Sequence, residues 1–66
     1  MKWEAEIYHP QKLRFIIDYD EYVGYYLYVW EGEKNTFDYL QDTLDIAKRQ
    51  ALEDFGVPLN VWKQVE

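Results

Sequence analysis

The chain has 66 residues, of which 48% are hydrophobic and 20% aromatic, and it contains no cysteine. Its 13 acidic and 7 basic residues give a formal net charge of -6. These values predict one small globular domain, residues 1–66, without disulfides or thiolate-bound metal. The negative charge repels phosphate backbones, so we expect no nucleic acid partner and favour a basic partner if the protein has a charged one.

Neither a membrane span nor a secretory leader is expected. No run of apolar residues approaches the roughly 20 that a bilayer-spanning helix needs. The first residues begin a strand pattern at once, which leaves no room for the apolar region of a signal peptide. We therefore expect a cytoplasmic protein that does not bind membranes.

Two alternating segments near the N-terminus predict a β-hairpin. In residues 3–8 and 12–19, apolar residues recur at every second position, which is the pattern of a half-buried strand. Between them, His9 and Pro10 form a break, since proline has no amide to donate to a sheet. The side expected to be buried carries Trp3, Ala5, Ile7, Leu13, Phe15, Ile17 and Tyr19.

Residues 25–31 form the densest β-forming run of the chain, after a connection in which Gly24 can take a positive φ. Leu27 and Val29 are expected on the buried face of this third strand. The side chains of Tyr26, Tyr28 and Trp30 are expected on the opposite face.

Residues 36–41 follow a predicted turn at 32–35 and are compatible with either a strand or an early helix start. Phe37 and Leu40 would extend a helical stripe. Against this, the aromatic residues alternate with Thr and Asp, and a stronger helix cap follows at Asp42. We favour a fourth strand.

Residues 42–55 are the one segment with a helical period. Asp42, with Asp45 three residues later, predicts the cap at the helix start, and Gly56 followed by Pro58 predicts its end. The apolar residues recur at steps of three and four, which stacks them into one narrow stripe. This stripe consists of Leu44, Ala47, Ala51 and Phe55.

The segment from Asp42 to Trp62, which contains Gly-Val-Pro-Leu-Asn-Val-Trp, resembles a pattern in small bacterial proteins of no assigned function. Those proteins look like an antiparallel hairpin sheet followed by one helix and a Gly-Val/Ile-Pro-x-x-x-Trp tail. The resemblance implies this architecture and brings no activity, cofactor or catalytic residue. Residues 57–62 are expected to fold back and close one end of the core.

The expected fold is therefore α+β, an antiparallel meander of three or four strands with one helix packed on one face. Catalytic side chains are scarce. The chain has no Ser or Cys, and its two Thr have structural explanations, so acyl transfer lacks a nucleophile. His9 is expected to be solvated, and a single histidine cannot form a zinc site alone. We expect no metal, no cofactor and no enzymatic activity.

The uncovered sheet face is the first candidate site, because one helix shields only one side of a meander. Soluble monomers rarely leave a contiguous apolar patch open to water, so we predict that a second protein chain, identical or different, binds there. One alternative is simple cross-strand pairing of the rings, and another is that Val61 and Trp62 cover them. The predicted binding residues are Tyr8, Arg14, Ile16, Tyr26, Tyr28 and Trp30.

An acidic end is the second candidate site. In a meander, the start of the first strand, the 18–24 connection and the helix start come together. Glu4 and Asp18 are expected to face each other across the hairpin, which is an unfavourable like-charge pairing. The predicted acidic patch, a site for a basic partner, consists of Glu4, Asp18, Asp20, Glu21 and Asp42.

Three classes of function fit these observations. The first is a non-enzymatic protein-interaction or regulatory module, self-associating or binding a different chain through the aromatic face. The second is an acidic inhibitor of a basic protein, of the immunity, antitoxin or nucleic-acid-mimic kind. The third is an enzyme using carboxylate or tyrosine acid-base chemistry, which requires a pocket and a strongly shifted pKa. We favour the first, because aromatic surface is abundant.

Overall fold

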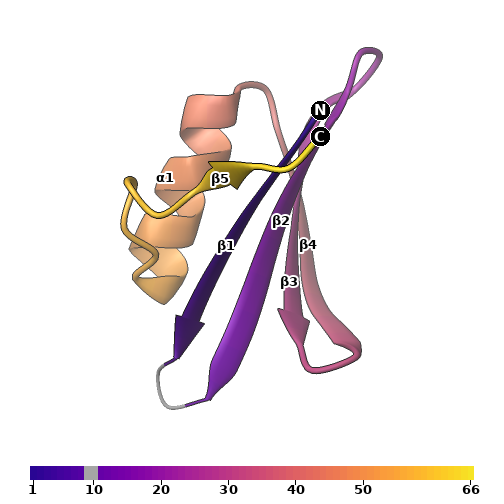
Figure 1. The fold of residues 1–66 in the computed structure, drawn as a ribbon. Helices are drawn as coiled ribbons and strands as arrows, with labels where there is room; N and C mark the ends of the chain where they lie inside the picture. Colours follow the sequence, from indigo (N-terminus) through magenta and orange to yellow (C-terminus); the bar gives the residue numbers. More distant parts are fainter. Residues whose placement is uncertain (9–10) are drawn as a thin grey trace.

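The computed structural model describes residues 1–8 and 11–66. These residues form one antiparallel sheet, in the order β4-β3-β2-β1-β5, and one helix that crosses a single face of it (Figure 1). This is the α+β fold expected from the sequence. The elements are β1 (Lys2–Tyr8), β2 (Lys12–Asp20), β3 (Gly24–Glu31), β4 (Lys34–Gln41), α1 (Leu44–Phe55) and β5 (Lys63–Gln64).

The core lies between α1 and the sheet, and it confirms the alternation predicted for the first three strands. The small side chains of Ala47 and Ala51 are fully buried and let α1 approach the sheet closely. Tyr19 lies near the end of β2 and is exposed. The buried hydrophobic residues are Trp3, Ala5, Phe15, Ile17, Leu27, Val29, Ala47, Ala51 and Val57.

Residues 36–41 are part of a strand, as favoured, but this strand begins earlier than predicted. Glu31 pairs with Lys34, so the connection between β3 and β4 contains only Gly32 and Glu33. Gly32 has a φ of 63°, which glycine accepts readily at the first position of a two-residue hairpin loop. The predicted turn at 32–35 is therefore too long by two residues.

The predicted N-cap of the helix is wrong by one residue. Thr43, not Asp42, is the N-cap, and its Oγ1 accepts a hydrogen bond from the amide of Ile46 at 3.1 Å. Asp42 and Thr43 are adjacent residues that both favour the cap position, so sequence alone does not choose between them. The predicted end is confirmed, because Gly56 has a φ of 76° and closes the helix in the left-handed conformation.

We predict that Ala51→Leu lowers the free energy of unfolding by about 1–3 kcal/mol, because Ala51 is fully buried where α1 meets the sheet. The added side chain would force α1 away from the strands. Chemical denaturation measures the change, with Leu52→Ala on the exposed side of α1 as the comparison. Equal stability of Ala51→Leu and the wild-type protein would show that the helix packs in another register.

Candidate functional site

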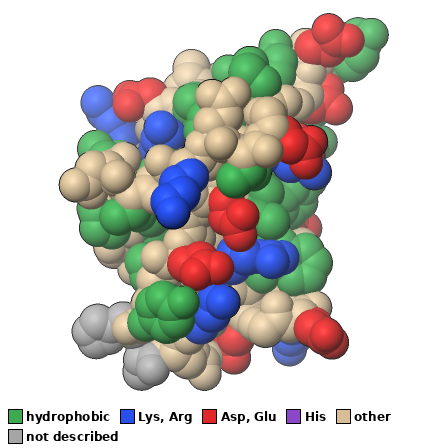
Figure 2. Space-filling view, in the orientation of Figure 1, with side chains coloured by type: hydrophobic (Ala, Val, Ile, Leu, Met, Phe, Trp, Pro, Cys, Tyr) green, Lys and Arg blue, Asp and Glu red, His purple; other side chains and the backbone are tan. Residues whose placement is uncertain are grey.

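All six residues predicted to bind a partner lie on the sheet face turned away from α1. The strand alternation places them there, because the neighbouring residues Phe15 and Leu27 point into the core. Arg14 is directly opposite Trp30 in the β2–β3 ladder, and Ile16 is opposite Tyr28. We call this whole side of the sheet the open face; the six predicted residues on it are Tyr8, Arg14, Ile16, Tyr26, Tyr28 and Trp30. Acidic and basic side chains lie next to one another across the front of the molecule (Figure 2).

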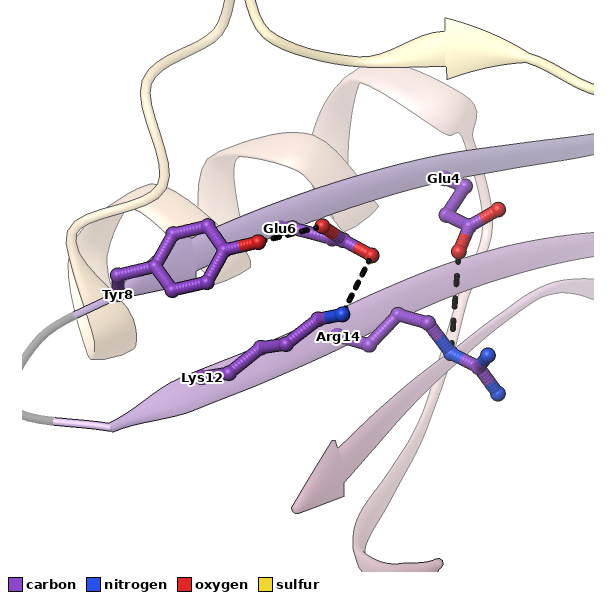
Figure 3. Close-up of polar contacts among 5 residues, drawn as sticks. All are labelled: Glu4, Glu6, Tyr8, Lys12 and Arg14. Carbon is purple, nitrogen blue, oxygen red and sulfur yellow. Dashed lines mark hydrogen bonds and ion pairs between the residues drawn. The ribbon is translucent and has the colours of Figure 1, made fainter. Parts of the chain in front are cut away.

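One part of the open face joins an acid, a base and a ring across β1 and β2. Lys12 Nζ lies 3.5 Å from a carboxylate oxygen of Glu6, and the Tyr8 hydroxyl donates to Glu6 at 3.2 Å (Figure 3). The same Lys12 Nζ lies 6.0 Å from the ring centroid of Tyr8. These three side chains form a carboxylate–cation–ring triad, held by ion pairing and by attraction between the cation and the ring.

A second triad of the same composition lies beside the first. Arg14 Nε is 3.8 Å from a carboxylate oxygen of Glu4 (Figure 3), and the guanidinium carbon of Arg14 is 6.0 Å from the ring centroid of Trp30. The triad therefore spans β1, β2 and β3. An open hollow of about 470 Å³ lies against Arg14 and Trp30 at this end of the sheet.

A different arrangement occupies the β2–β4 side of the open face. The rings of Tyr26 and Tyr28 are stacked, with centroids 5.8 Å apart and an interplanar angle of 16°. Asp18 is directly opposite Tyr26 on β2, and Asp38 is directly opposite Tyr28 on β4. We call these four residues the Tyr-Asp cluster. Desolvation, followed by the charge of Asp18, raises the pKa of Tyr28, with smaller contributions from other neighbours including Asp38.

Neither carboxylate of the Tyr-Asp cluster forms an ion pair within the described residues, and Lys2, which is directly opposite Asp18, is paired with Glu66. Among residues 1–8 and 11–66, no Lys or Arg forms an ion pair with Asp18 or Asp38. Asp38 accepts a hydrogen bond from the Asn35 amide at 2.7 Å. The two triads thus carry their own cations, whereas the Tyr-Asp cluster offers its charge to solvent.

The three segments predicted to meet at an acidic end do meet. The Tyr19 amide donates to the carbonyl of Met1 at 3.0 Å, and Gly24 at the start of β3 lies against the backbone of Gln41 at the end of β4. Both termini lie at this end as well (Figure 1). Of the predicted acidic patch, Asp18, Asp20, Glu21 and Asp42 belong to the segments gathered here.

The predicted pairing of Glu4 with Asp18 is wrong. Glu4 is opposite Ile16 and is paired with Arg14, whereas Asp18 is opposite Lys2. The register of the hairpin depends on which residue of β1 is paired with which residue of β2 next to the turn. The alternating pattern does not specify that pair. Opposite charges therefore face each other where like charges were expected.

The tail does not cover the open face. Trp62 lies on the α1 side of the sheet, with its ring 6.5 Å from that of Phe15, and Val61 is exposed. β5 then adds to the sheet beside β1, where Lys63 pairs with Glu4. The alternative in which Val61 and Trp62 bury the aromatic rings is therefore wrong. Tyr28 and Trp30 are half-buried by their own strand neighbours.

Sequence reasoning missed three members of this surface, namely Glu6, Lys12 and Asp38. The signal for the first two is visible, since two acids alternate in the first strand and two bases alternate in the second.

In the described residues, no group of three or more acidic or histidine side chains is arranged to hold a metal ion. His9, expected to be solvated, lies outside the described residues. No helix in this part of the chain is long and apolar enough to cross a membrane.

Comparison with known proteins gives no relative for this chain, because no family model, no curated protein and no solved structure matches it. The resemblance of the segment from Asp42 to Trp62 to small bacterial proteins stays a prediction.

Proposed function

We propose that the protein is a cytoplasmic interaction module that acts by binding, not by catalysis, and that its open face contacts a second protein chain. One observation carries the proposal. Three of the four aromatic rings of β3, those of Tyr26, Tyr28 and Trp30, lie on the side of the sheet that neither α1 nor the C-terminal tail covers, whereas Tyr25 packs against the core. Tyr and Trp suit such a surface, because each ring brings a large contact area with few rotatable bonds to immobilise.

The open face combines rings that can be buried with polar atoms that keep it soluble when free. Tyr8 is 70% exposed, and its hydroxyl is held by Glu6. Trp30 is flanked by the guanidinium of Arg14. A partner would find aromatic area on β3 and ion pairs beside it on β1 and β2, a mixture of apolar and polar surface that many protein interfaces have.

A different protein is the favoured partner over a second copy. Two copies would each carry a formal charge of -6, and their mutual repulsion opposes association. The gathering of Asp18, Asp20, Glu21 and Asp42 at one end of the sheet favours a basic partner in particular. This gathering also supports the second candidate function, an acidic inhibitor of a basic protein.

We predict that Tyr28→Ala combined with Trp30→Ala abolishes association while leaving the fold intact. Both rings are only half-buried, so their removal takes little from the core. The measurement is size-exclusion chromatography of the tagged protein in extract of its native host, together with sizing of the purified protein alone. The wild-type protein is expected to elute with a partner from extract, and the double variant to elute alone.

The matched control is Ile46→Ala combined with Leu52→Ala, which removes two exposed apolar side chains from α1. This control is expected to keep the partner. Chemical denaturation of both double variants shows whether each remains folded. Association that survives loss of the two rings, or that is lost equally in the control, would contradict the proposal.

A further inference from the structure

We propose that the Tyr-Asp cluster binds a cationic side chain of the partner protein, and that this side chain is an arginine. The inference rests on the proposed function and adds the chemistry of the partner. It assigns Asp18, Tyr26, Tyr28 and Asp38 to one guanidinium site on the β2–β4 side of the open face.

The two triads on the open face show how a carboxylate, a cation and a ring combine on this sheet. Glu6 with Lys12 and Tyr8 forms one complete carboxylate–cation–ring triad, and Glu4 with Arg14 and Trp30 forms another. The Tyr-Asp cluster has the carboxylates and the rings of such a triad, but the neighbouring base Lys2, opposite Asp18, forms its ion pair with Glu66 at 3.6 Å. A partner's arginine would complete it.

The cross-strand register arranges the site as two rows. In one row, Asp18 lies beside Tyr26, and Leu40 lies on the far side. In the next row the order is reversed, so that Ile16 lies beside Tyr28 and Asp38 lies on the far side. The two carboxylates therefore flank the stacked rings from opposite sides. Each ring also has an apolar neighbour against which the methylene stem of a long side chain can pack.

The ring spacing determines where the cation can lie. Atoms in optimal contact are about 3.5–4.0 Å apart, so a planar group between two rings would need roughly 7 Å. The centroids of Tyr26 and Tyr28 are 5.8 Å apart, which leaves no space for it. The guanidinium therefore lies against an outer face of the ring pair, not between the rings, where Asp18 or Asp38 can accept its hydrogen bonds.

Arginine suits this surface better than lysine. Its guanidinium is planar, weakly hydrated and able to stack on a ring while donating to a carboxylate. Burial and the neighbouring carboxylates raise the pKa of Tyr28, which keeps the phenol neutral, so the negative charge of the site comes from the two aspartates. The cation would be held by the charge of the aspartates and by the face of one tyrosine ring.

The test uses two blocked peptides, acetyl-Gly-Arg-Gly-Arg-Gly-amide and the same sequence with citrulline in place of both arginines. Citrulline has nearly the same shape but no charge. Each is titrated at low salt into the isotope-labelled full-length protein, and NMR records the backbone amide shifts. We expect the arginine peptide to shift the amides of Tyr26 and Tyr28, and the citrulline peptide to bind about tenfold more weakly.

Asp18→Asn combined with Asp38→Asn is expected to weaken binding of the arginine peptide about tenfold. Glu53→Gln combined with Asp54→Asn, on the exposed side of α1, makes the same change in net charge and is expected to leave binding unchanged. The amide spectrum also reports whether each variant keeps its fold. Equal weakening by the two pairs would show only general attraction to an acidic protein, and would overturn the arginine site.

Equal binding of the two peptides would also overturn the inference, as would shifts confined to residues outside the open face. None of these results would remove the proposed function. That proposal fails only if association with a protein survives loss of Tyr28 and Trp30 or is lost equally when Ile46 and Leu52 are replaced. The two failures are therefore distinguishable.

Discussion

Phe15→Ala is expected to lower the free energy of unfolding by about 3–5 kcal/mol, the usual cost of deleting a buried aromatic side chain. Phe15 lies in β2 and is 0% exposed. Its ring centroid is 5.3 Å from that of Phe55 in α1 and 6.5 Å from that of Trp62 in the tail. The side chain thus joins three elements, and no single movement can fill the cavity that its loss would leave.

A loss of this size matters because the domain is small. At about 0.05–0.15 kcal/mol per residue, a chain of this length has roughly 3–10 kcal/mol of total stability. Chemical denaturation is therefore expected to find Phe15→Ala largely unfolded or unfolding at much lower denaturant. Tyr22→Ala is the matched control, since Tyr22 is 87% exposed and its loss should change stability by no more than about 0.5 kcal/mol. Similar midpoints for the two variants would contradict the core described here.

Gly24→Ala is expected to be comparably damaging, at about 2–6 kcal/mol. Gly24 has a φ of 118°, which costs a residue with a Cβ roughly 1–3 kcal/mol. A Cβ built at this position would also lie 2.6 Å from the backbone carbonyl oxygen of Gln41. Because that atom belongs to the sheet, β4 would have to move, which adds about 1–3 kcal/mol.

Gly32→Ala separates these two effects. Gly32 also has a positive φ, 63°, but a Cβ there would meet no atom within 4 Å. Its replacement should therefore cost only the backbone strain, about 1–2 kcal/mol. Thermal or chemical unfolding of the two variants measures the difference. If Gly32→Ala proved as destabilising as Gly24→Ala, contact between a Cβ at position 24 and the carbonyl oxygen of Gln41 would add nothing to the cost.

The sequence was sufficient to assign side chains to the two faces of the sheet. In a strand, successive residues point to opposite sides, so the alternation of apolar residues around Phe15 and Val29 determines the opposite face as well. The placement of Tyr28 and Trp30 on the open face follows from that period alone. The helix stripe was equally accessible, because Ala47 and Ala51 recur at the helical spacing.

Features that depend on contacts between distant segments could not be predicted from the sequence. The register of β1 against β2 decides that Glu4 pairs with Arg14 and not with Asp18, and this register depends on the hairpin turn. β5 was missed because its two residues, Lys63 and Gln64, have no pattern of their own and become a strand only by pairing with β1. The triads and the Tyr-Asp cluster depend on register. The sequence shows the alternating acids of the first strand and bases of the second, but not which side chains face each other.

The division of the open face into two parts has a functional consequence. The β1–β2 part neutralises its own charges, so it would contribute packing area and orientation to a complex. The β2–β4 part, with Asp18 and Asp38, would contribute the choice of partner, because unpaired charges reject like charges and attract opposite ones. Binding through this part is expected to weaken as salt concentration rises.

Photo-cross-linking tests most directly whether the open face is the binding surface. A photoreactive phenylalanine analogue would replace Tyr28 in one variant and Glu53, exposed on α1, in another, and both would be irradiated in the native host. We expect a covalent adduct with a second protein chain from position 28 and none from position 53. An adduct from position 53 with none from position 28 would contradict it.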